Sequence, residues 1–279
     1  MNQVDQPAVI VIPARLSSTR LAEKLLLRET GKSVLQHTYE RAIQSKLASR
    51  VIIATDHERI LEEVDSFDGE AVMTDPGANS GTDRVAQVAE ELDEFDIIAN
   101  VQGDEPELNP EHIDLAISRL RTSRDTVMST LAAPIRSDSQ WYDSACVKVV
   151  VGGAGNALYF SRSPIPFVRE STDVGKGEGA TGNSGEDRAI CVAAGALQHI
   201  GLYAYRREFL LTLASLPPSR LEELERLEQL RVLEAGYSIA VDEVDHACGG
   251  IDTADDYAAF VARESQNAVQ SDLDHRKAG

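Results

Sequence analysis

The sequence predicts an α/β fold with a mainly parallel β-sheet, and two observations carry this prediction. Short apolar runs typical of buried strands alternate with helical patterns through the first half of the chain, and a β-α-β-α order is typical of a parallel sheet with helices on both faces. The chain has 279 residues, of which 42% are hydrophobic, which is enough for one large domain with a substantial core. The middle of the chain adds extended segments that we expect to form a smaller sub-lobe of mixed strands.

The strands and helices of the first half follow from the spacing of their apolar residues. Four apolar runs predict strands, at 8–12, 51–54, 71–73 and 96–101. Predicted helices begin after the N-cap Ser33, run through Ile60 and Val64, and cover 82–92. Because ligands of such sheets bind at the carboxyl ends of the strands, the segments that follow these strands are candidates for a site.

The second half is predicted as further strands and helices with one long loop. Strands are expected at 127–134, 147–151, 156–161, 198–205 and 238–241, and helices at 206–214, at 219–235 and from Thr253. A glycine-rich stretch at 170–196 is expected to be a flexible loop. We therefore expect a single domain over 1–279, with a first half at about 8–135, a sub-lobe at about 136–205, a return to the main sheet at about 206–264 and a frayed tail after 265.

Composition and charge exclude several classes of function. The formal net charge is −19, and such a surface repels nucleic acid and anionic lipid, so neither nucleic acid nor a membrane is an expected partner. The longest apolar runs stay well under the ~18 residues of a membrane span, and the N-terminus lacks the basic region of a secretory signal. Cys146, Cys191 and Cys248 are far apart and odd in number, which argues against a disulfide framework and a thiolate zinc site. Together these features predict a cytoplasmic protein.

A cluster of cations follows the first predicted strand. The segment 13–24 carries three cations and three hydroxyls, on Arg15, Arg20, Lys24, Ser17, Ser18 and Thr19. Guanidinium and ammonium groups in this place suit a triphosphate, because they donate charged hydrogen bonds to phosphoryl oxygens. A solvated basic loop has the same pattern, and the residues alone leave both interpretations open.

Carboxylates stand at two further turns. Asp104 follows the strand 96–101 and a glycine turn, which presents it at the carboxyl edge of the sheet, where a hard divalent cation bound to phosphate would sit. An acidic β-turn is the alternative interpretation. Either Asp252 or Thr253 caps the last helix, and the functional interpretation makes Asp252 a second metal ligand facing Asp104.

Two other patterns carry weaker functional signals. The segment 80–84 is typical of a helix N-cap, although its hydroxyl and free backbone groups also suit the edge of a pyrimidine base. His199 and Tyr203 share one face of a predicted strand, and a lone strand histidine is more often structural than catalytic.

These motifs occur in the order found in one family. The segment 11–21 with Lys24 resembles the nucleotide-binding opening of the 3-deoxy-manno-octulosonate cytidylyltransferases. Further segments resemble that family in its order: 54–56, 80–84, 100–106, 147–150, 159–162, 199–205, 227–233 and 250–253. The agreement runs from about residue 9 to residue 262, and although single motifs are weak, the ordered set is highly specific.

The resemblance implies a fold, a reaction and an assembly. The fold is the Rossmann-like sheet of nucleotide-diphospho-sugar transferases, with a CTP-binding half at about 8–135 and a sugar-site and dimer sub-lobe at about 136–205. The reaction transfers CMP from CTP to 3-deoxy-D-manno-octulosonate (Kdo), which gives CMP-Kdo for lipopolysaccharide biosynthesis and pyrophosphate, with Mg²⁺ as cofactor. Family members are usually homodimers, with the middle strands forming part of the contact.

The resemblance also implies roles for individual residues. It implies that CTP is bound by Ala14, Arg15, Arg20, Lys24, Ser80, Gly81, Arg84 and Gln102, and that Arg15, Lys24 and Asp104 are catalytic. It implies that the sugar acid is contacted by Gln102, Arg162, His199, Tyr203, Glu228 and Gln229. Asp104 and Asp252 would bind magnesium.

The main departure from the family is at Ala22–Glu23, where the best-known pattern has Pro-Gly. Glycine allows close approach of the backbone to phosphate, and Glu23 adds a carboxylate beside a polyanion, which weakens CTP binding unless its side chain points outward. Two alternatives stay open: a cytidylyltransferase for another acidic sugar, such as a sialic acid or 8-amino-Kdo, and a non-catalytic nucleotide-binding relative. The Ala22–Glu23 departure is the only support for the second.

Overall fold

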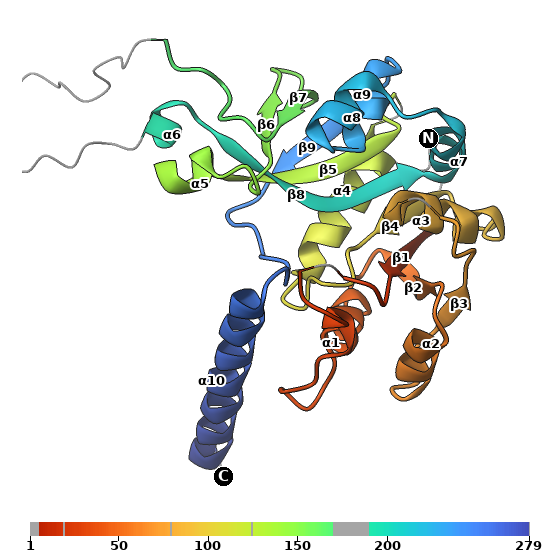
Figure 1. Cartoon of the computed structure of the whole chain (residues 1–279), viewed down its shortest axis with the longest axis vertical. Coiled ribbons are helices and arrows are strands. Elements are labelled where there is room, and N and C mark those ends of the chain that lie inside the picture. The colour runs from red at the N-terminus through yellow and green to blue at the C-terminus, as the bar shows by residue number, and fades with distance from the viewer. Residues whose placement is uncertain (1–5, 19, 79, 124, 170–189, 279) are drawn as a thin grey trace, which may run out of the picture. The chain divides into compact units, whose positions relative to one another are not determined.

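The computed structural model describes the chain except for residues 1–5, 19, 79, 124, 170–189 and 279 (Figure 1). The chain divides into two compact units. Unit 1 comprises 1–118, 202–214 and 248–279, and unit 2 comprises 119–201 and 215–247. Most of the loop expected at 170–196 therefore lies outside the described residues.

Unit 1 is built on a mainly parallel sheet, as the β-α-β-α pattern predicts. Its strands are β1 (Ala8–Ala14), β2 (Ala48–Thr55), β3 (Ala71–Met73) and β4 (Ile97–Asn100). β1 pairs in parallel with both β2 and β4, and β2 pairs in parallel with β3. The second half of β8 (Leu197–Arg206) runs antiparallel to β4 and places Tyr203 opposite Asn100.

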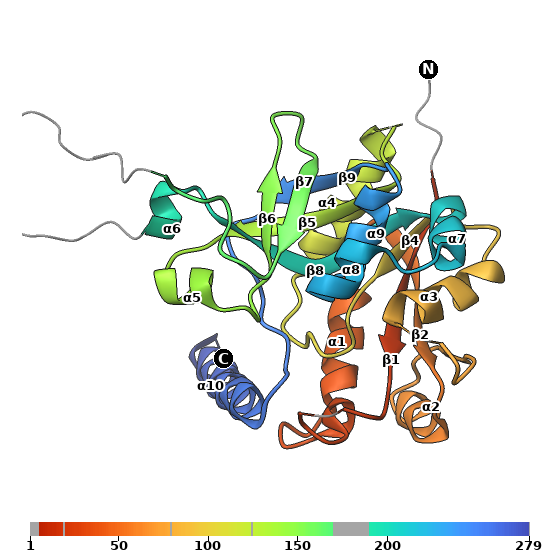
Figure 2. The same cartoon turned by 45° about the horizontal axis from the view of Figure 1, so that its top comes forward.

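Helices connect the strands of unit 1, and the N-cap predicted at Ser33 is present. The helical segments are η1 (Lys24–Leu26), α1 (Val34–Ala42), α2 (Glu58–Asp65), α3 (Gly81–Glu90), α4 (Pro110–Thr122), α7 (Arg207–Ser215) and α10 (Ala254–Ala278), and Figure 2 shows α1, α2 and α3 around β1 and β2. The side chain of Ser33 accepts a hydrogen bond of 3.0 Å from the backbone N–H of Gln36, which confirms the predicted N-cap of α1. The helix α4 was not predicted, although Pro110 at its start and apolar residues three or four apart are its sequence signals.

The burial of β1 in the core of unit 1 explains why its sequence is a continuous apolar run. The side chains from Val9 to Ile12 are completely buried, because helices cover both faces of a parallel strand. Full burial of each such side chain contributes about 1.5–3 kcal/mol to stability. The loop that follows β1 therefore starts from a rigid base.

Unit 2 is the mixed sub-lobe. It contains β5 (Met128–Pro134), β6 (Lys148–Val151), β7 (Ala157–Ser161), the first half of β8, β9 (Ile239–Glu243), α5 (Asp138–Tyr142), α6 (Ile190–Ala193), α8 (Arg220–Glu225) and α9 (Gln229–Glu234). β5 pairs in parallel with β9, whereas β6 pairs antiparallel with β7 and β8. This combination confirms mixed strands in the middle of the chain.

The structure differs from the expected bounds in four places. The first segment of unit 1 ends at Ser118 rather than near 135, and 215–247 belongs to unit 2, in which β9 pairs with β5. The helix expected at 219–235 is two helices, because Arg226 adopts a left-handed backbone conformation with φ 55° at the end of α8. The tail expected to fray after 265 continues as α10 to Ala278, in keeping with its content of alanine, glutamine and charged residues that favour helices.

Within the described residues, none of the helices combines the length and the apolar character that a membrane crossing requires.

Candidate active site

A pocket of about 480 Å³ lies in unit 1 at the carboxyl ends of β1 and β4. Its lining comes from segments far apart in the sequence: Pro13, Arg15, Ser17, Ser18, Arg20, Lys24, Leu25, Gly81, Gln102, Gly103, Asp104 and Asp252. The structure therefore brings together the cations after β1 and the two carboxylates that the sequence singled out. The remaining hydroxyl of that segment, on Thr19, lies outside the described residues.

Lys24 is the centre of the polar contacts in this pocket. Its Nζ donates hydrogen bonds to Asp104 Oδ2 at 2.5 Å and to Asp252 Oδ1 at 3.0 Å. It also donates to the carbonyl oxygen of Ile251 at 2.7 Å. The Nη2 atom of Arg20 lies 2.9 Å from the same Asp252 oxygen. Two carboxylates and two cations thus form one connected charge cluster on the pocket wall.

Backbone contacts hold the two carboxylates together. The backbone N–H of Ile251 donates to the carbonyl of Asp104 at 2.8 Å, so the segment before α10 is attached directly to the turn after β4. The buried hydroxyl of Thr38 in α1 donates to the carbonyl of Gly103 at 3.0 Å, which fixes the position of that turn. A side chain at Gly103 would crowd the carbonyl of Pro13, since a Cβ there would lie 3.3 Å from its oxygen. The turn therefore needs glycine for a close approach to the loop after β1.

The N-terminus of α10 is capped in the way that the structural interpretation of its motif predicts. Asp256 Oδ2 accepts hydrogen bonds from the backbone N–H groups of Asp252 and Thr253, at 3.2 Å and 2.8 Å. The Thr253 hydroxyl accepts from the Asp256 N–H, so Thr253 is the capping residue. Asp252 lines the pocket, and its role as a metal ligand stays a prediction.

The surroundings of Lys24 and Glu105 raise the pKa of both groups, which favours a charged Lys24 and a neutral Glu105. Burial disfavours the charged form of Lys24, but the Asp104 and Asp252 carboxylates outweigh it and raise the pKa of this ammonium. Glu105 lies beside Asp104 and is buried, and burial together with the Asp104 charge raises its pKa to about 8. At neutral pH, Lys24 is therefore charged and Glu105 is mainly protonated.

The residues expected around the cytosine occupy two kinds of position. Gly81 and Gln102 line the pocket, and the Gln102 amide also lies 3.3 Å from Asn100 Oδ1. Ser80 caps α3, where its hydroxyl accepts from the Asp83 N–H at 3.0 Å. Arg84 is fully buried and donates to Asp56 Oδ2 at 2.6 Å and to the Thr74 hydroxyl.

Ala14 is buried as the last residue of β1. The lining of the pocket includes none of Ala14, Ser80 and Arg84, and a contact of these three residues with a base stays a prediction. The fixed positions of Ser80 and Arg84 shape the start of α3, where Gly81 meets the pocket.

The Glu23 carboxylate is turned away from the pocket. It forms a two-pronged ion pair with the guanidinium of Arg59 in α2, with Nη2 to Oε2 at 2.8 Å and a second bond from Nη1 to Oε1. The hydrogen bond with Arg59 lowers the pKa of Glu23. The departure from the Pro-Gly pattern therefore adds no free carboxylate beside Lys24, and the main reason for expecting weak CTP binding does not apply.

The donor set at Asp104 and Asp252 suits a magnesium ion. Both carboxylates contact one ammonium, so they are close enough to share a single cation. Carboxylate oxygens are the ligands Mg²⁺ prefers, and it is usually held by one or two carboxylates together with substrate phosphates. Among the described residues there is no group of three or more histidine, cysteine, aspartate or glutamate side chains that would hold a metal alone. The pair therefore fits a metal that arrives with a phosphate ligand.

Of the residues expected to contact the sugar acid, Gln102 and Tyr203 belong to unit 1, and Arg162, His199, Glu228 and Gln229 belong to unit 2. The guanidinium of Arg162 donates to three backbone carbonyls, of Glu225 at 2.8 Å, Ser144 at 3.0 Å and Arg226 at 3.4 Å. Arg162 thus supports the left-handed turn that leads from α8 to Glu228 and Gln229 in α9.

His199 and Gln229 are both buried polar side chains. The ring of His199 is 8% exposed, its Nε2 lies 3.0 Å from the Thr130 hydroxyl, and its ring packs edge-on against Phe160. Burial lowers the pKa of His199 to about 3, so the ring is neutral at pH 7. The buried Nε2 of Gln229 has no hydrogen-bond partner among the described residues, which leaves a donor available. Contact of either side chain with a sugar stays a prediction.

Two features of the structure were not assigned from sequence. Lys148 is completely buried, and its ammonium donates to the carbonyls of Asp143, Cys146 and Arg162 at 2.9, 2.6 and 2.7 Å. A lysine at the start of a predicted strand is the only sequence signal for it. Pro13 and Leu25 also line the pocket. Their positions depend on the path of the loop after β1, which cannot be predicted from the residue types alone.

The fold and this pocket define a nucleotidyltransferase. A family model described as cytidylyltransferase matches residues 9–239, so the class is that of the cytidylyltransferases.

Named relatives identify the family within this class. The chain is 47% identical over 261 residues to a 3-deoxy-manno-octulosonate cytidylyltransferase of Rhodopirellula baltica, with 92% of this chain and 99% of that protein covered. A protein of the same name from Geotalea daltonii is 47% identical over 253 residues, with 91% and 96% covered. This chain belongs to the 3-deoxy-manno-octulosonate cytidylyltransferase family.

Solved structures agree with this assignment. The structure of a CMP:2-keto-3-deoxy-manno-octonic acid synthetase complexed with CTP superposes with a TM-score of 0.83 at 38% identity, covering 94% of this chain and 99% of that one. A 4-diphosphocytidyl-2C-methyl-D-erythritol synthase from Anaerococcus prevotii superposes with a TM-score of 0.57 at 12% identity over 93% of this chain and 98% of its own, which shows the shared fold alone. The Rossmann-like fold of the nucleotide-diphospho-sugar transferase type is thereby confirmed.

Proposed function

We propose that this protein transfers CMP from CTP to Kdo, forming CMP-Kdo for lipopolysaccharide biosynthesis and releasing pyrophosphate. The single observation that carries the proposal is the contact of Lys24 with both Asp104 and Asp252 in a pocket that Arg15 and Arg20 also line. Family membership supplies the sugar, since the relatives that cover nearly the whole chain are named for Kdo. The outward position of Glu23 removes the feature that had favoured a non-catalytic relative.

On the CTP side, the cations of the loop after β1 bind the triphosphate. Arg15 and Arg20 present guanidinium groups that match phosphate oxygens in a fork geometry. Lys24, which its environment keeps protonated, donates to the α-phosphate and to the leaving pyrophosphate as negative charge develops there. Gly81 and Gln102 border the base. Little covalent chemistry is left for the protein, so positioning dominates catalysis.

Asp104 and Asp252 hold Mg²⁺ in this proposal. When bound, the metal supplies positive charge that lowers the pKa of the attacking anomeric hydroxyl and offsets the charge of the triphosphate. Asp104 and Asp252 would hold the metal beside Lys24, whose ammonium lies within hydrogen-bonding distance of both carboxylates. Because the protein has a formal net charge of −19, a bound metal would help to offset the negative charge of the triphosphate.

Isothermal titration calorimetry tests the metal assignment without turnover. We expect CTP to bind more tightly with Mg²⁺ than with EDTA, and Asp252→Asn to lose that gain. Asp255→Asn is the control, because Asp255 is an exposed residue in the first turn of α10. An equal gain in the wild type and in Asp252→Asn would remove Asp252 from the metal site.

On the sugar side, Gln102, Arg162, His199, Tyr203, Glu228 and Gln229 contact Kdo. The neutral ring of His199 and the unpartnered amide of Gln229 suit hydroxyl groups, because both offer hydrogen bonds without a buried charge.

Pyrophosphate release tests the reaction and the sugar together. The protein is incubated with CTP, Mg²⁺ and either Kdo, 8-amino-Kdo or N-acetylneuraminate. Release with Kdo alone is the expected result. Release with another of these sugars would keep the mechanism and change the specificity, and no release from folded protein would contradict the proposed activity.

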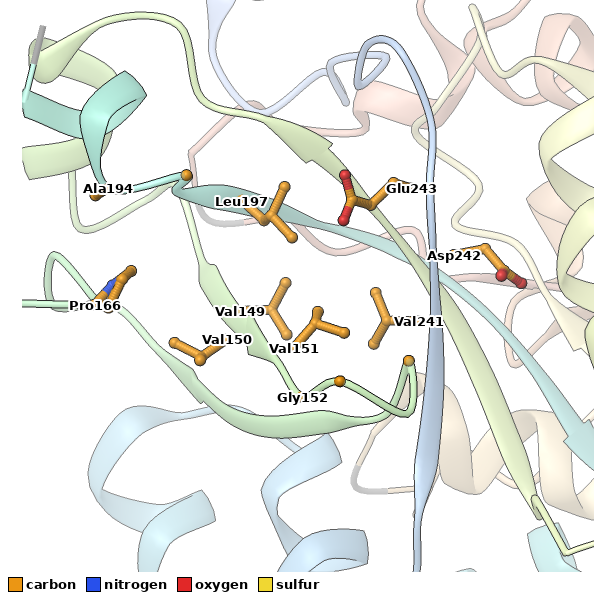
Figure 3. A pocket seen from close by; sticks show the side chains of 13 residues that line it. Val149, Val150, Val151, Gly152, Pro166, Ala194, Leu197, Val241, Asp242 and Glu243 are labelled. Atoms are coloured by element: carbon orange, nitrogen blue, oxygen red, sulfur yellow. The ribbon is translucent and has the colours of Figure 1, made fainter. Parts of the chain in front are cut away.

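The proposed assembly is a homodimer that uses the middle strands. A hollow of about 590 Å³ in unit 2 is lined by Val149, Val150 and Val151 of β6 and by the end of β9, and Figure 3 shows the Glu243 carboxylate turned toward Leu197 and that of Asp242 turned away. Leu158 in β7 packs on Gly152 at the rim and is 65% exposed, and Phe167 is 85% exposed. We propose these exposed apolar side chains and the hollow as the contact surface of the dimer.

Light scattering after gel filtration tests the dimer. Leu158→Asp is expected to shift the protein toward the monomer, whereas Leu224→Asp, on the exposed side of α8, leaves the mass unchanged. A monomeric wild type would contradict the proposal. We also propose that the protein works in the cytoplasm, in keeping with its three free cysteines.

A further inference from the structure

The residue before Lys24 adopts an unusual backbone conformation. Glu23 has φ 50° and ψ 31°, in the left-handed region that glycine occupies freely and other residues avoid. Its carbonyl accepts a hydrogen bond of 2.8 Å from the Leu26 N–H, so the left-handed residue begins the short helix η1. The conformation of Glu23 therefore decides the direction in which the chain presents Lys24.

An ion pair opposes the cost of this conformation. Both Glu23 carboxylate oxygens accept hydrogen bonds from Arg59, which lies in the first turn of α2. The position of Arg59 is itself set, because its backbone N–H donates to the ring of His57, the N-cap of α2, at 3.1 Å. Such forked arginine–carboxylate pairs constrain geometry more than single contacts between exposed charges.

The consequence for the pocket follows from the position of Lys24. The ammonium makes three directed contacts, with Asp104, Ile251 and Asp252, and each requires the correct start of η1. If Glu23 relaxed to a right-handed conformation, the following Cα–Cβ bond would point elsewhere and these contacts would break. A released Glu23 carboxylate would also be free to approach the phosphate-binding cations.

We propose that the Glu23–Arg59 ion pair is a positioning clamp that fixes the left-handed turn before Lys24 and thereby sets the affinity for CTP. Arg59 and Glu23 are positioning residues here, since they act through Lys24. The clamp performs in this chain the function of a flexible glycine at the same position. The inference rests on the proposed CTP-binding function of the pocket.

A double-mutant design separates backbone positioning from simple charge neutralisation. Arg59→Ala should raise KM for CTP about fivefold, equivalent to about 1 kcal/mol, because the left-handed turn loses its support. Adding Glu23→Gly should restore KM, since glycine adopts this turn at little cost. Adding Glu23→Gln instead should not restore it, because glutamine removes the charge but keeps the strain.

A second readout does not depend on activity. Hydrogen exchange of the Leu26 amide, which donates to the Glu23 carbonyl, should become faster in Arg59→Ala and return to the wild-type rate in Glu23→Gly/Arg59→Ala. Arg263→Ala is the matched control, since it breaks another exposed forked pair, with Glu107 at 2.8 and 2.6 Å, and should change neither KM nor this exchange rate.

The outcomes are distinguishable. Unchanged exchange and unchanged KM in Arg59→Ala would overturn the clamp, and so would equal recovery by Glu23→Gln and Glu23→Gly. A wild type that releases no pyrophosphate with any sugar would contradict the proposed function, while the exchange rates would still decide whether the clamp exists.

Discussion

The Lys24 cluster in unit 1 and the cations Lys148 and Arg162 of unit 2 use the same kinds of side chain in different ways. In unit 1, Lys24 and Arg20 pair with the carboxylates Asp104 and Asp252 on the wall of an open pocket. In unit 2, Lys148 and Arg162 donate to backbone carbonyls instead. The first arrangement consists of charges that a ligand can displace, and the second consists of supports for turns.

This difference teaches how to separate binding residues from supporting residues. A carboxylate can exchange an ammonium for a metal ion, because the carboxylate then pairs with the metal and the ammonium with a phosphate of the ligand. A carbonyl that loses its buried lysine gains nothing and stays unpaired, which costs about 1–3 kcal/mol. Substitutions of Lys24, Asp104 and Asp252 should therefore affect activity more than stability, and substitution of Lys148 should do the reverse.

The largest expected effect is that of Asp104→Asn. Removal of this charge should lower kcat for pyrophosphate release by about 10³-fold or more at saturating Mg²⁺, because both the proposed metal site and the orientation of Lys24 depend on it. The melting temperature should change little, since Asp104 is partly exposed. Glu107→Gln is the control, and an active Asp104→Asn enzyme would remove Asp104 from the catalytic set.

Lys148→Met should destabilise the protein by about 3 kcal/mol, because three carbonyl oxygens would lose their shared donor. Chemical denaturation measures the free energy of unfolding. The affinity for CTP, measured by calorimetry on folded protein, should stay within about twofold. The exposed Lys46→Met is the matched control, and a CTP affinity that fell with stability would break the distinction between the two regions.

The stability should fall in acid because of His199. Its pKa is about 3 in the folded state, whereas 6.5 is its ordinary value, so the unfolded chain binds more protons between these two limits. Stability is thus unaffected by this group above pH 6.5 and decreases as the pH falls below it, by about 2 kcal/mol at pH 5. Unfolding curves at pH 7 and pH 5 should show a correspondingly smaller loss in His199→Gln, and equal losses in both proteins would contradict a neutral buried ring.

The smallest effect separates a helix cap from a base contact. Ser80→Ala and Ser33→Ala each remove an N-cap hydrogen bond of 3.0 Å and should each cost about 1 kcal/mol of stability. If Ser80 also touches cytosine, only its variant should raise KM for CTP. Equal KM values in the two variants would limit Ser80 to capping α3.

Much of unit 1 was predictable because its signals are local. The apolar run at 8–12, the Ser33 cap and the cations after β1 each depend on residues close in the sequence. The break at Arg226 was not predictable, since the leucine spacing continues through it and the capping box of α8 does not reveal where that helix ends. The helix α4 was not predicted, although Pro110 at its start and its apolar spacing are local signals of a helix.

The sequence by itself determined the order of strands and helices in unit 1, the family, and the charged residues available at the ends of the strands. These properties follow from side-chain periodicity and from short motifs, which operate over a few residues. Only the tertiary structure decided that Asp252 meets Asp104 on Lys24, that Glu23 turns to Arg59, and that Arg162 and Lys148 support turns. The physical reason is that each of these contacts joins groups distant in the sequence, which only the fold brings within hydrogen-bonding distance.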